Sequence, residues 1–461
     1  MNSTLELIYF IIVTIGMIYA FYRLGINKIS ILVILIFWAG LFQYIGVQAH
    51  NSYKVFVALY ALFLVRKSIF KVTGVNDQII NILFLFFSIS FWVSYYYSGG
   101  SIITILSQYL YKYGLVFVLY YFAKSIMLHD STRLRLQNTL VLVLYIQVFL
   151  SLIKLSFWGF GNEPIVGSMA AGGAGTAVVI PIVGMIFFWV IKNGKFSKID
   201  WLISFSFLII AIASGKRQPI VFYPLVLVLL FTYVSKSYNL IRILKYLPIG
   251  LLLFYFGVRL TPSFTPEDRT MGSFDIEYVR DYALKYYFGT ENVTMIFNGK
   301  YNTGFGRGSA ITYFFNPSML NLHSTKDILF GKGRYEVAVG EQGRFTKTGF
   351  SNYGIDHQGL MGEAGAMIYS FGYIGSLFML FFAVSVIFTC SNKKLALLIF
   401  LYFLWDFLFY YNQVVYSSQS ILLVIFIVLY YRTENGIKKN RQLPDDFYDS
   451  TKKINYLSGR H

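Results

Sequence analysis

Cysteine, histidine and charge are all scarce in this sequence of 461 residues. The whole chain holds one cysteine, Cys390, and five histidines, which excludes a disulfide framework and any cysteine-rich metal site. Charged residues make up 13% of the chain, whereas 56% of it is hydrophobic, with 46 Phe and 38 Tyr. One soluble core cannot enclose so much apolar surface. The composition therefore predicts a membrane protein.

Motifs for nucleotides, nucleic acids and metals are also missing. No Gly-x-x-x-x-Gly-Lys-Ser/Thr segment follows a predicted strand, so nucleotide hydrolysis is not expected. No stacked aromatic and basic motif indicates a nucleic-acid partner, and the net charge of +18 needs another explanation. No cluster of His, Asp and Glu has the spacing of metal ligands, so we expect neither a metal nor a cofactor.

Apolar runs recur from residue 5 to residue 431 with one long interruption. Because a membrane helix needs about 20 apolar residues, we predict an all-α polytopic membrane protein with about 13 transmembrane helices. Residues 1–258 hold helices one to ten, 259–361 form a large extracytoplasmic loop, 362–431 hold helices eleven to thirteen, and 432–461 form a cytoplasmic tail. The predicted spans are 5–21, 29–47, 51–65, 78–96, 103–123, 136–157, 174–192, 199–213, 219–234, 246–258, 366–390, 395–411 and 416–431.

The distribution of Lys and Arg predicts the orientation, because short cytoplasmic loops retain positive charge. One set of alternate loops holds sixteen basic residues, and the opposite short loops hold three, Lys54, Lys216 and Arg217. The sixteen are Arg23, Lys28, Arg66, Lys67, Lys71, Lys124, Arg133, Arg135, Lys192, Lys195, Lys198, Lys236, Arg242, Lys245, Lys393 and Lys394. We therefore predict that these loops and the C-terminus are cytoplasmic, and that much of the net charge is a topology signal.

Lys216 and Arg217 break this charge rule, since they lie in a tight outward turn between two predicted helices. Paired cations at the outer membrane surface suit a phosphate or diphosphate head group, because Arg offers a planar fork and Lys a point charge. Contact of a solvated turn with ordinary lipid head groups is the alternative interpretation.

The large loop has eleven basic and ten acidic residues between Arg259 and Asp356, so it is not a simple polybasic tether. Aromatic residues at helical spacing in 274–297, with Arg280 among them, predict an amphipathic helix at the membrane surface. Further on lies the segment Gly331-Lys332-Gly333-Arg334. Its glycines allow the backbone to approach a ligand closely, and its lysine and arginine supply positive charge. A plain solvated loop is the alternative for Arg334.

Asp356, His357 and Glu363 lie where the loop re-enters the apolar region. A neutral imidazole accepts a proton near physiological pH, and a nearby carboxylate can orient it, so these residues are candidates for acid–base chemistry. His357 as a helix cap or interfacial residue is the alternative. Lys112 and Asp406 fall inside predicted spans, where charge is costly, so we expect them to pair or to line one water-filled cavity. A purely structural pair is equally compatible with the sequence.

Three segments resemble a known family. The turn Ser214-Gly215-Lys216-Arg217, the segment Phe330-Gly331-Lys332-Gly333-Arg334 and the re-entry segment 357–375 are similar to those of the O-antigen polymerase and ligase superfamily, and most similar to Wzy-type repeat-unit polymerases of O-antigen, capsule or exopolysaccharide pathways. The apolar pattern covers the whole chain, whereas the motifs cover some forty residues. The interval from His357 to Gly365 is shorter than in many members.

The resemblance implies a GT-C-like glycosyltransferase in the bacterial cytoplasmic (inner) membrane, working at its extracytoplasmic face. It implies metal-independent transfer between two undecaprenyl-diphosphate-linked oligosaccharides, with membrane lipid, a chain-length regulator and a flippase as candidate partners. Fixed cations would stabilise the diphosphate leaving group, and a general base would deprotonate the acceptor hydroxyl. The candidates are Arg217, Lys216, Arg280 and Arg334 for the diphosphate, His357 for the base, and Glu363 or Asp356 in second place.

Two other functions fit parts of the sequence. An O-antigen ligase would share the chemistry and differ in its acceptor. A lipid-linked oligosaccharide flippase or another transporter would explain many spans and intramembrane charges. A transporter would not need a loop of about a hundred residues, and no inverted internal repeat is found.

Overall fold

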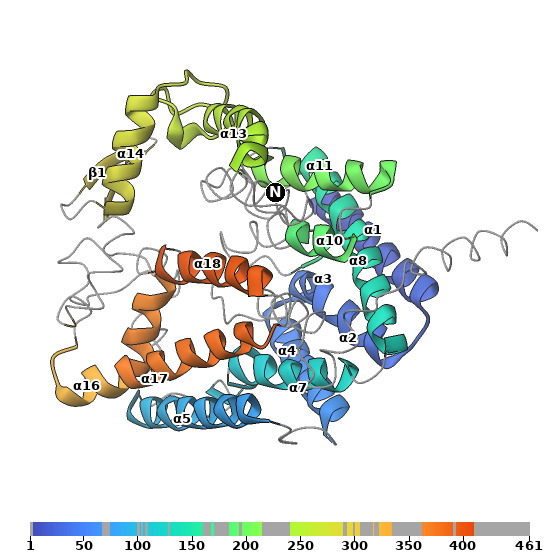
Figure 1. The fold of residues 1–461 in the computed structure, drawn as a ribbon, viewed down its shortest axis with the longest axis vertical. Coiled ribbons are helices and arrows are strands. Elements are labelled where there is room, and N and C mark those ends of the chain that lie inside the picture. Colours follow the sequence, from blue (N-terminus) through green and yellow to red (C-terminus); the bar gives the residue numbers. More distant parts are fainter. Residues whose placement is uncertain are drawn as a thin grey trace, which may run out of the picture.

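The structure of the protein is a computed structural model (Figure 1). It describes residues 3–66, 74–98, 102, 105–106, 109–127, 130–159, 167–169, 184–192, 196–213, 240–288, 293–297, 300–304, 317, 322–333, 362–390 and 393–409. The predicted spans 219–234 and 416–431 and the tail 432–461 lie outside these residues.

Helices dominate the described chain, which confirms the predicted helical class. In chain order the elements are α1 (Ser3–Leu24), α2 (Lys28–Phe37), α3 (Ala39–Ile45), α4 (Val47–Val65), α5 (Val75–Ser98), the π-helical turn η1 (Tyr109–Gly114), α7 (Leu115–Met127), α8 (Asp130–Trp158), α10 (Met185–Lys192), α11 (Lys198–Ala213), α13 (Leu240–Leu260), the 3-10 turn η3 (Pro262–Phe264), α14 (Ile276–Phe288), β1 (Val293–Phe297), β2 (Lys300–Gly304), α16 (Thr325–Phe330), α17 (Gly362–Phe388) and α18 (Lys393–Phe409).

Four helices are long and apolar enough to cross a membrane, namely Thr4–Leu24, Val75–Tyr96, Leu134–Trp158 and Met367–Phe388. Shorter apolar helices cover Lys28–Phe37, Ser52–Val65 and Leu247–Leu260. The window in α1 is only 17% buried, and several of its large apolar side chains are exposed, among them Leu7, Ile15 and Ile18. Such an apolar exterior is stable against lipid and costly in water. The full set of thirteen spans stays a prediction.

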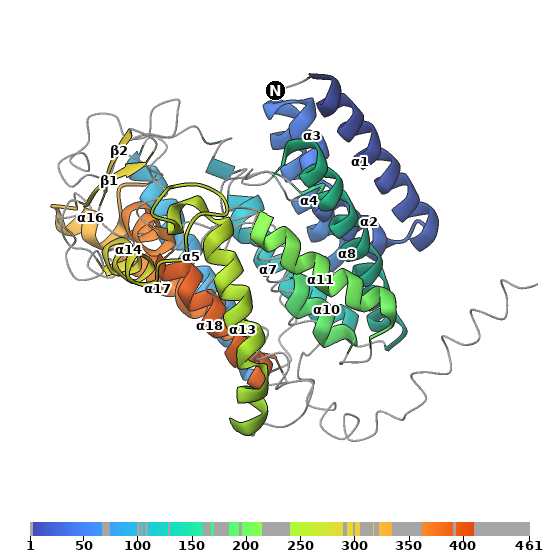
Figure 2. The same cartoon turned by 90° about the horizontal axis from the view of Figure 1, so that it is seen from above.

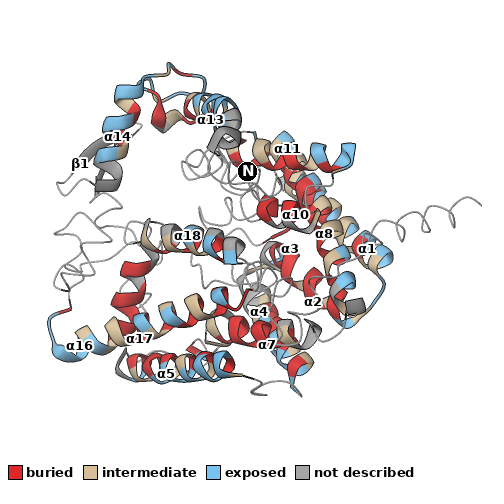
Figure 3. Ribbon diagram, in the orientation of Figure 1, coloured by how far each residue is buried: buried red, intermediate tan, exposed pale blue. Residues whose placement is uncertain are grey.

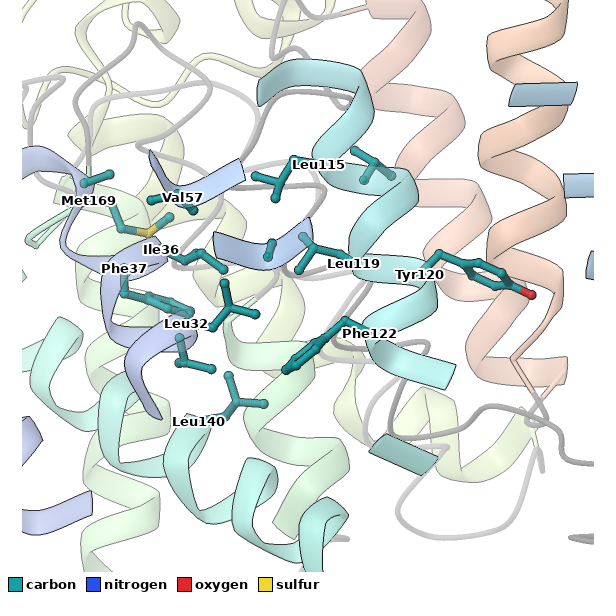
Figure 4. Packing of buried hydrophobic residues seen from close by; sticks show 14 of the residues in the cluster. Leu32, Ile36, Phe37, Val57, Leu115, Leu119, Tyr120, Phe122, Leu140 and Met169 are labelled. Atoms are coloured by element: carbon teal, nitrogen blue, oxygen red, sulfur yellow. The ribbon is translucent and has the colours of Figure 1, made fainter. Parts of the chain in front are cut away.

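The helices form two groups, seen side by side in Figure 2. One group contains α1 to α4, α8, α10 and α11, and the other contains α5, α13, α14, α16, α17 and α18. Buried residues gather along the faces at which helices meet (Figure 3). In Figure 4, buried side chains of α2, α4, α7 and α8 meet around one cluster that includes Leu32, Phe37, Val57, Leu119 and Leu140.

Helices α5 and α17 pack extensively against each other in antiparallel orientation. Phe86 stacks on Phe378 at 5.0 Å, and Phe84 meets Phe382 at 5.4 Å. Gly375 permits this approach, because a Cβ there would lie 3.2 Å from the Cβ of Ser90 on α5. Aromatic pairs at these separations add stability beyond the apolar area that they bury.

Two of the basic residues predicted to be cytoplasmic pair with buried carboxylates. Lys124 at the end of α7 forms an ion pair with Asp77 in the first turn of α5. Lys192 at the end of α10 lies 3.0 Å from Asp200 in the first turn of α11. Each pair places a carboxylate near a helix N-terminus and an ammonium near a helix C-terminus, so the helix dipoles favour both charges.

The predicted span 29–47 is broken in the structure. α2 ends at Phe37 and α3 begins at Ala39, and the turn Gly167–Met169 packs into the gap. The Ser168 hydroxyl donates to the Phe37 carbonyl at 2.9 Å, and the Gly40 N–H donates to the Ser168 carbonyl at 2.9 Å. Backbone groups freed by a broken helix are therefore hydrogen-bonded, as an apolar surrounding requires.

The first half of the large loop contains the predicted helix, shorter than expected. α14 spans Ile276–Phe288 and packs through Tyr282 against Val258 and Phe264. The end of the predicted segment is instead the strand β1, which pairs antiparallel with β2 in the register Val293↔Gly304. The predicted amphipathic helix therefore ends at Phe288 and not at residue 297, and the hairpin is an exception within the helical class, because its β-branched and aromatic residues favour extended backbone.

Candidate functional site

A turn of the large loop is seated in a break of α17. Gly372 lies inside the apolar helix with φ 65° and ψ −172°, so the helical geometry stops there and resumes afterwards. The break falls ten residues after Gly362, or about 15 Å along a helix. α16 and the turn Gly331–Gly333 pack against this break, as the view in Figure 1 shows for α16. We call this arrangement, α16 with Gly331–Gly333 on the break at Gly372, the loop clasp.

Backbone hydrogen bonds join the two sides of the loop clasp. The Lys332 N–H donates to the Tyr369 carbonyl at 2.8 Å, and the Gly333 N–H donates to the Ser370 carbonyl at 3.0 Å. Ser94 on α5 donates its hydroxyl to the same Ser370 carbonyl. Because the break deprives these carbonyls of their helical partners, the loop and α5 supply the bonds that α17 lacks.

Only glycine fits at the centre of the loop clasp. Gly331 has φ 75°, and a Cβ there would lie 2.5 Å from the Gly372 N atom and from the Ser370 carbonyl. A Cβ on Gly372 would lie 2.3 Å from the backbone of Leu329. Both the left-handed backbone and the close approach of two main chains require the absence of a side chain. A short helix N-cap, with Ser324 accepting from the Asp327 N–H at 3.0 Å, fixes the start of α16.

The π-helical turn η1, which carries Lys112, lies beside the same break. Tyr113 on this turn meets Phe371, the residue before Gly372, edge to face at 5.6 Å. Tyr109 on the same turn shares a hydrogen bond of 2.6 Å with Ser88 of α5. π-helical turns are rare and occur often at functional sites. The structure thus brings the backbone of Lys112, the loop clasp and α17 to one place, although the Lys112 side chain is not among the described ones.

One polar atom near the break has no hydrogen-bond partner. Ser376, four residues beyond Gly372, is 3% exposed, and its buried hydroxyl makes no hydrogen bond within the described part of the chain. A buried hydroxyl without a partner costs about 1–3 kcal/mol.

The start of the large loop is held by its own hydrogen bonds. The Arg259 side chain donates to the Gly272 carbonyl at 3.0 Å, and the Met271 N–H donates to the Arg259 carbonyl at 2.6 Å. The hydroxyl and the N–H of Ser273 donate to Glu267 and hold the pKa of this carboxyl below its usual value. This part of the loop is a folded turn that carries α14.

Arg280, one of the predicted diphosphate contacts, lies on α14 and is exposed. Its side chain pairs with the adjacent Asp281 at 3.0 Å, and both are more than half exposed. Figure 1 shows α14 well separated from α16 and α17. The structure does not bring Arg280 to the loop clasp.

The other predicted site residues are described in part or not at all. Glu363 lies in the first turn of α17, and Asp406 lies in α18, but their side chains are outside the described ones. Lys216, Arg217, Arg334, Asp356 and His357 lie outside the described residues. Among the described residues, no group of three or more His, Cys, Asp and Glu side chains could hold a metal ion.

Sequence reasoning missed a buried lysine, Lys154. It lies four residues before the end of α8, is 4% exposed and sits 5.0 Å above the Tyr9 ring. The Tyr9 hydroxyl in turn donates to the Gly167 carbonyl at 2.8 Å. The signal was present, since an intramembrane lysine needs a partner just as Lys112 does. Lys154 was overlooked because it lies near the end of the predicted span 136–157.

The described part of the chain thus contains four helices that are long and apolar enough to cross a membrane, and a turn of the large loop is hydrogen-bonded to one of them. Comparisons with protein-family models, with curated proteins and with solved structures found no match for the chain.

Proposed function

We propose that this protein is a bacterial polysaccharide polymerase that joins undecaprenyl-diphosphate-linked oligosaccharide repeat units at the outer face of the cytoplasmic membrane. The observation that supports it is the loop clasp. The segment around Gly331–Gly333 and the segment leading to Gly372 are two of the three stretches that resemble repeat-unit polymerases. They are more than thirty residues apart in the sequence and are hydrogen-bonded to each other.

The reaction needs an active site formed by both the large loop and the membrane helices, because each of its two substrates has a lipid tail and a sugar head group. In the proposed step the acceptor hydroxyl oxygen attacks the anomeric carbon of the donor sugar, and the bond from that carbon to the diphosphate oxygen breaks. The acceptor proton passes to His357, with Glu363 or Asp356 as the alternative base. Undecaprenyl diphosphate leaves with its electron pair, and a single displacement inverts the anomeric centre.

The developing negative charge on the diphosphate requires fixed cations. Lys216, Arg217 and Arg334 are the proposed contacts, and Lys112 lies on η1 beside the clasp. Arg280 is a weaker candidate than the sequence suggested, because its guanidinium is exposed and paired with Asp281. No step in this scheme uses a nucleotide or a metal ion.

An O-antigen ligase is the nearest alternative, since it would use the same donor with a different acceptor. A flippase is the second. The loop clasp favours an enzyme over a flippase, because α17 is tied to the outer loop by backbone bonds that rigid-body rocking of α17 alone would break.

Single substitutions in cells test the proposal. Arg217→Ala and His357→Ala should abolish polymer while protein abundance and the delivery of single repeat units to the outer face stay normal. Loss of single repeats from the outer face would support the flippase instead. Loss of polysaccharide attachment with polymer still made on its lipid carrier would support the ligase.

A further inference from the structure

Lys332 is the charged residue at the centre of the loop clasp. Its backbone N–H is fixed on the Tyr369 carbonyl, and it stands between two buried glycines, Gly331 and Gly333. The main chain of Lys332 is therefore held on both sides, whereas its side chain is 29% exposed. Because the backbone of this cation is already fixed, ligand binding has to order only its side chain.

The only ion pair of Lys332 in the described part of the chain is a loose one. Its ammonium lies 3.9 Å from the Asp327 carboxylate, beyond hydrogen-bonding distance, and Asp327 is itself 22% exposed. Partly exposed pairs of this kind add about 1 kcal/mol or less. The pair therefore contributes little to the position of the ammonium, and an anion of higher charge can displace the Asp327 carboxylate.

We propose that the loop clasp is a positioning unit that presents the Lys332 ammonium to the diphosphate of a lipid-linked substrate, with Gly331 and Gly372 as its positioning residues. This inference rests on the proposed function and adds a cation that the resemblance did not assign. A diphosphate carries more negative charge than the Asp327 carboxylate, so its attraction to the ammonium is the stronger of the two.

Steady-state polymerisation by the purified full-length protein, with an undecaprenyl-diphosphate-linked repeat unit, tests the role of Lys332. Lys332→Ala should raise KM by about tenfold to a hundredfold, as expected for a lost hydrogen bond between charged groups. Lys332→Arg keeps the charge and should restore most of the affinity. Asp327→Asn is the matched control, because it removes the ion pair and leaves the ammonium, so KM should not rise. An equal rise in KM for Asp327→Asn would overturn the inference and make the pair structural.

The glycines need a control that separates backbone strain from close packing. Gly159 has φ 74°, almost the same as Gly331, but a Cβ there would have nothing within 4 Å. Gly331→Ala and Gly372→Ala should therefore lower kcat by tenfold or more, roughly, whereas Gly159→Ala should not. Equal effects at Gly159 and Gly372 would refute the positioning role. If Gly331→Ala or Gly372→Ala fails to accumulate in cells, the variants Lys332→Ala and Lys332→Arg alone test the inference.

A binding measurement keeps this inference separate from the proposed function. Undecaprenyl diphosphate in nanodiscs should raise the Tm of the wild-type protein, and this rise should be smaller for Lys332→Ala. If the wild type makes no polymer but shows this difference, the polymerase proposal fails and the Lys332 site stands. If the lipid diphosphate stabilises both proteins equally, or neither, the Lys332 site is wrong.

Discussion

Replacing Asp77 by alanine should destabilise the fold by about 3 kcal/mol, because it leaves a lysine without its counter-charge in a buried place. Asp77 is 1% exposed, accepts the Tyr120 hydroxyl at 2.7 Å and pairs with Lys124. Removing one partner of a buried pair costs about 3–5 kcal/mol. We expect the lower end of that range, because the Lys124 side chain is 12% exposed and keeps some contact with water.

The same reasoning orders two further variants. Tyr120→Phe removes one neutral donor to a carboxylate and should cost about 1–2 kcal/mol. The double variant Asp77→Leu with Lys124→Met leaves no buried charge, so it should be more stable than Asp77→Ala alone. Equilibrium unfolding in mixed detergent micelles measures these differences. A double variant destabilised by the full sum of its single variants would refute the reasoning, since the two side chains would then act independently.

Three other outcomes follow from the fold. Ser168→Ala should lower the free energy of unfolding by about 1–3 kcal/mol, because the Phe37 carbonyl at the break between α2 and α3 loses its hydrogen-bond donor. Thermal unfolding measures this loss. An unchanged Tm would mean that the break does not need this hydrogen bond. Neutralising Lys112 and Asp406 together, as Lys112→Met with Asp406→Leu, should destabilise less than the sum of the single changes; a larger effect in unfolding assays would show that they are not a pair. Cysteines at Ile26 and Tyr96, which are 83% and 84% exposed, should react with an impermeant maleimide from opposite sides of the membrane in a cysteine-free background; labelling of both from one side would contradict the predicted orientation.

The helices that the sequence predicted well are those with long, uninterrupted apolar runs. α1, α5 and α8 lie close to the spans expected from hydropathy alone, because lipid-length apolar segments have few alternatives to a helix. The break at Trp38 was missed, since its cause is the turn at Ser168, more than a hundred residues away. Such long-range packing leaves no local signal in the sequence.

The loop clasp illustrates the same limit at the candidate site. Gly331-Lys332-Gly333 attracted attention as a glycine-rich cationic turn, but its partner could not be identified from the sequence. Gly372 lies in an apolar run with several other small residues, and a glycine there is more often a close-packing position than a break. The steric requirement for glycine comes from the close approach of the Leu329 backbone to Gly372, which the sequence does not encode locally.

Charge reasoning from the sequence selected individual residues without their ion-pair partners. Lys124 and Lys192 were counted as topology signals, and the structure pairs both with buried aspartates. Arg280 was selected because an arginine on an amphipathic helix suits a diphosphate, yet its neighbour Asp281 already satisfies it. Adjacent opposite charges on one helix are a signal that the sequence contained and that a search for isolated cations overlooks.

Reconstitution of the purified protein with one defined undecaprenyl-diphosphate-linked repeat unit tests the central claim most directly. The account predicts a ladder of products, each longer by one repeat, in the presence of a chelator and without any nucleotide. Release of undecaprenyl diphosphate should equal the number of linkages formed. A folded protein that binds the substrate and leaves every repeat unit unjoined would contradict the account.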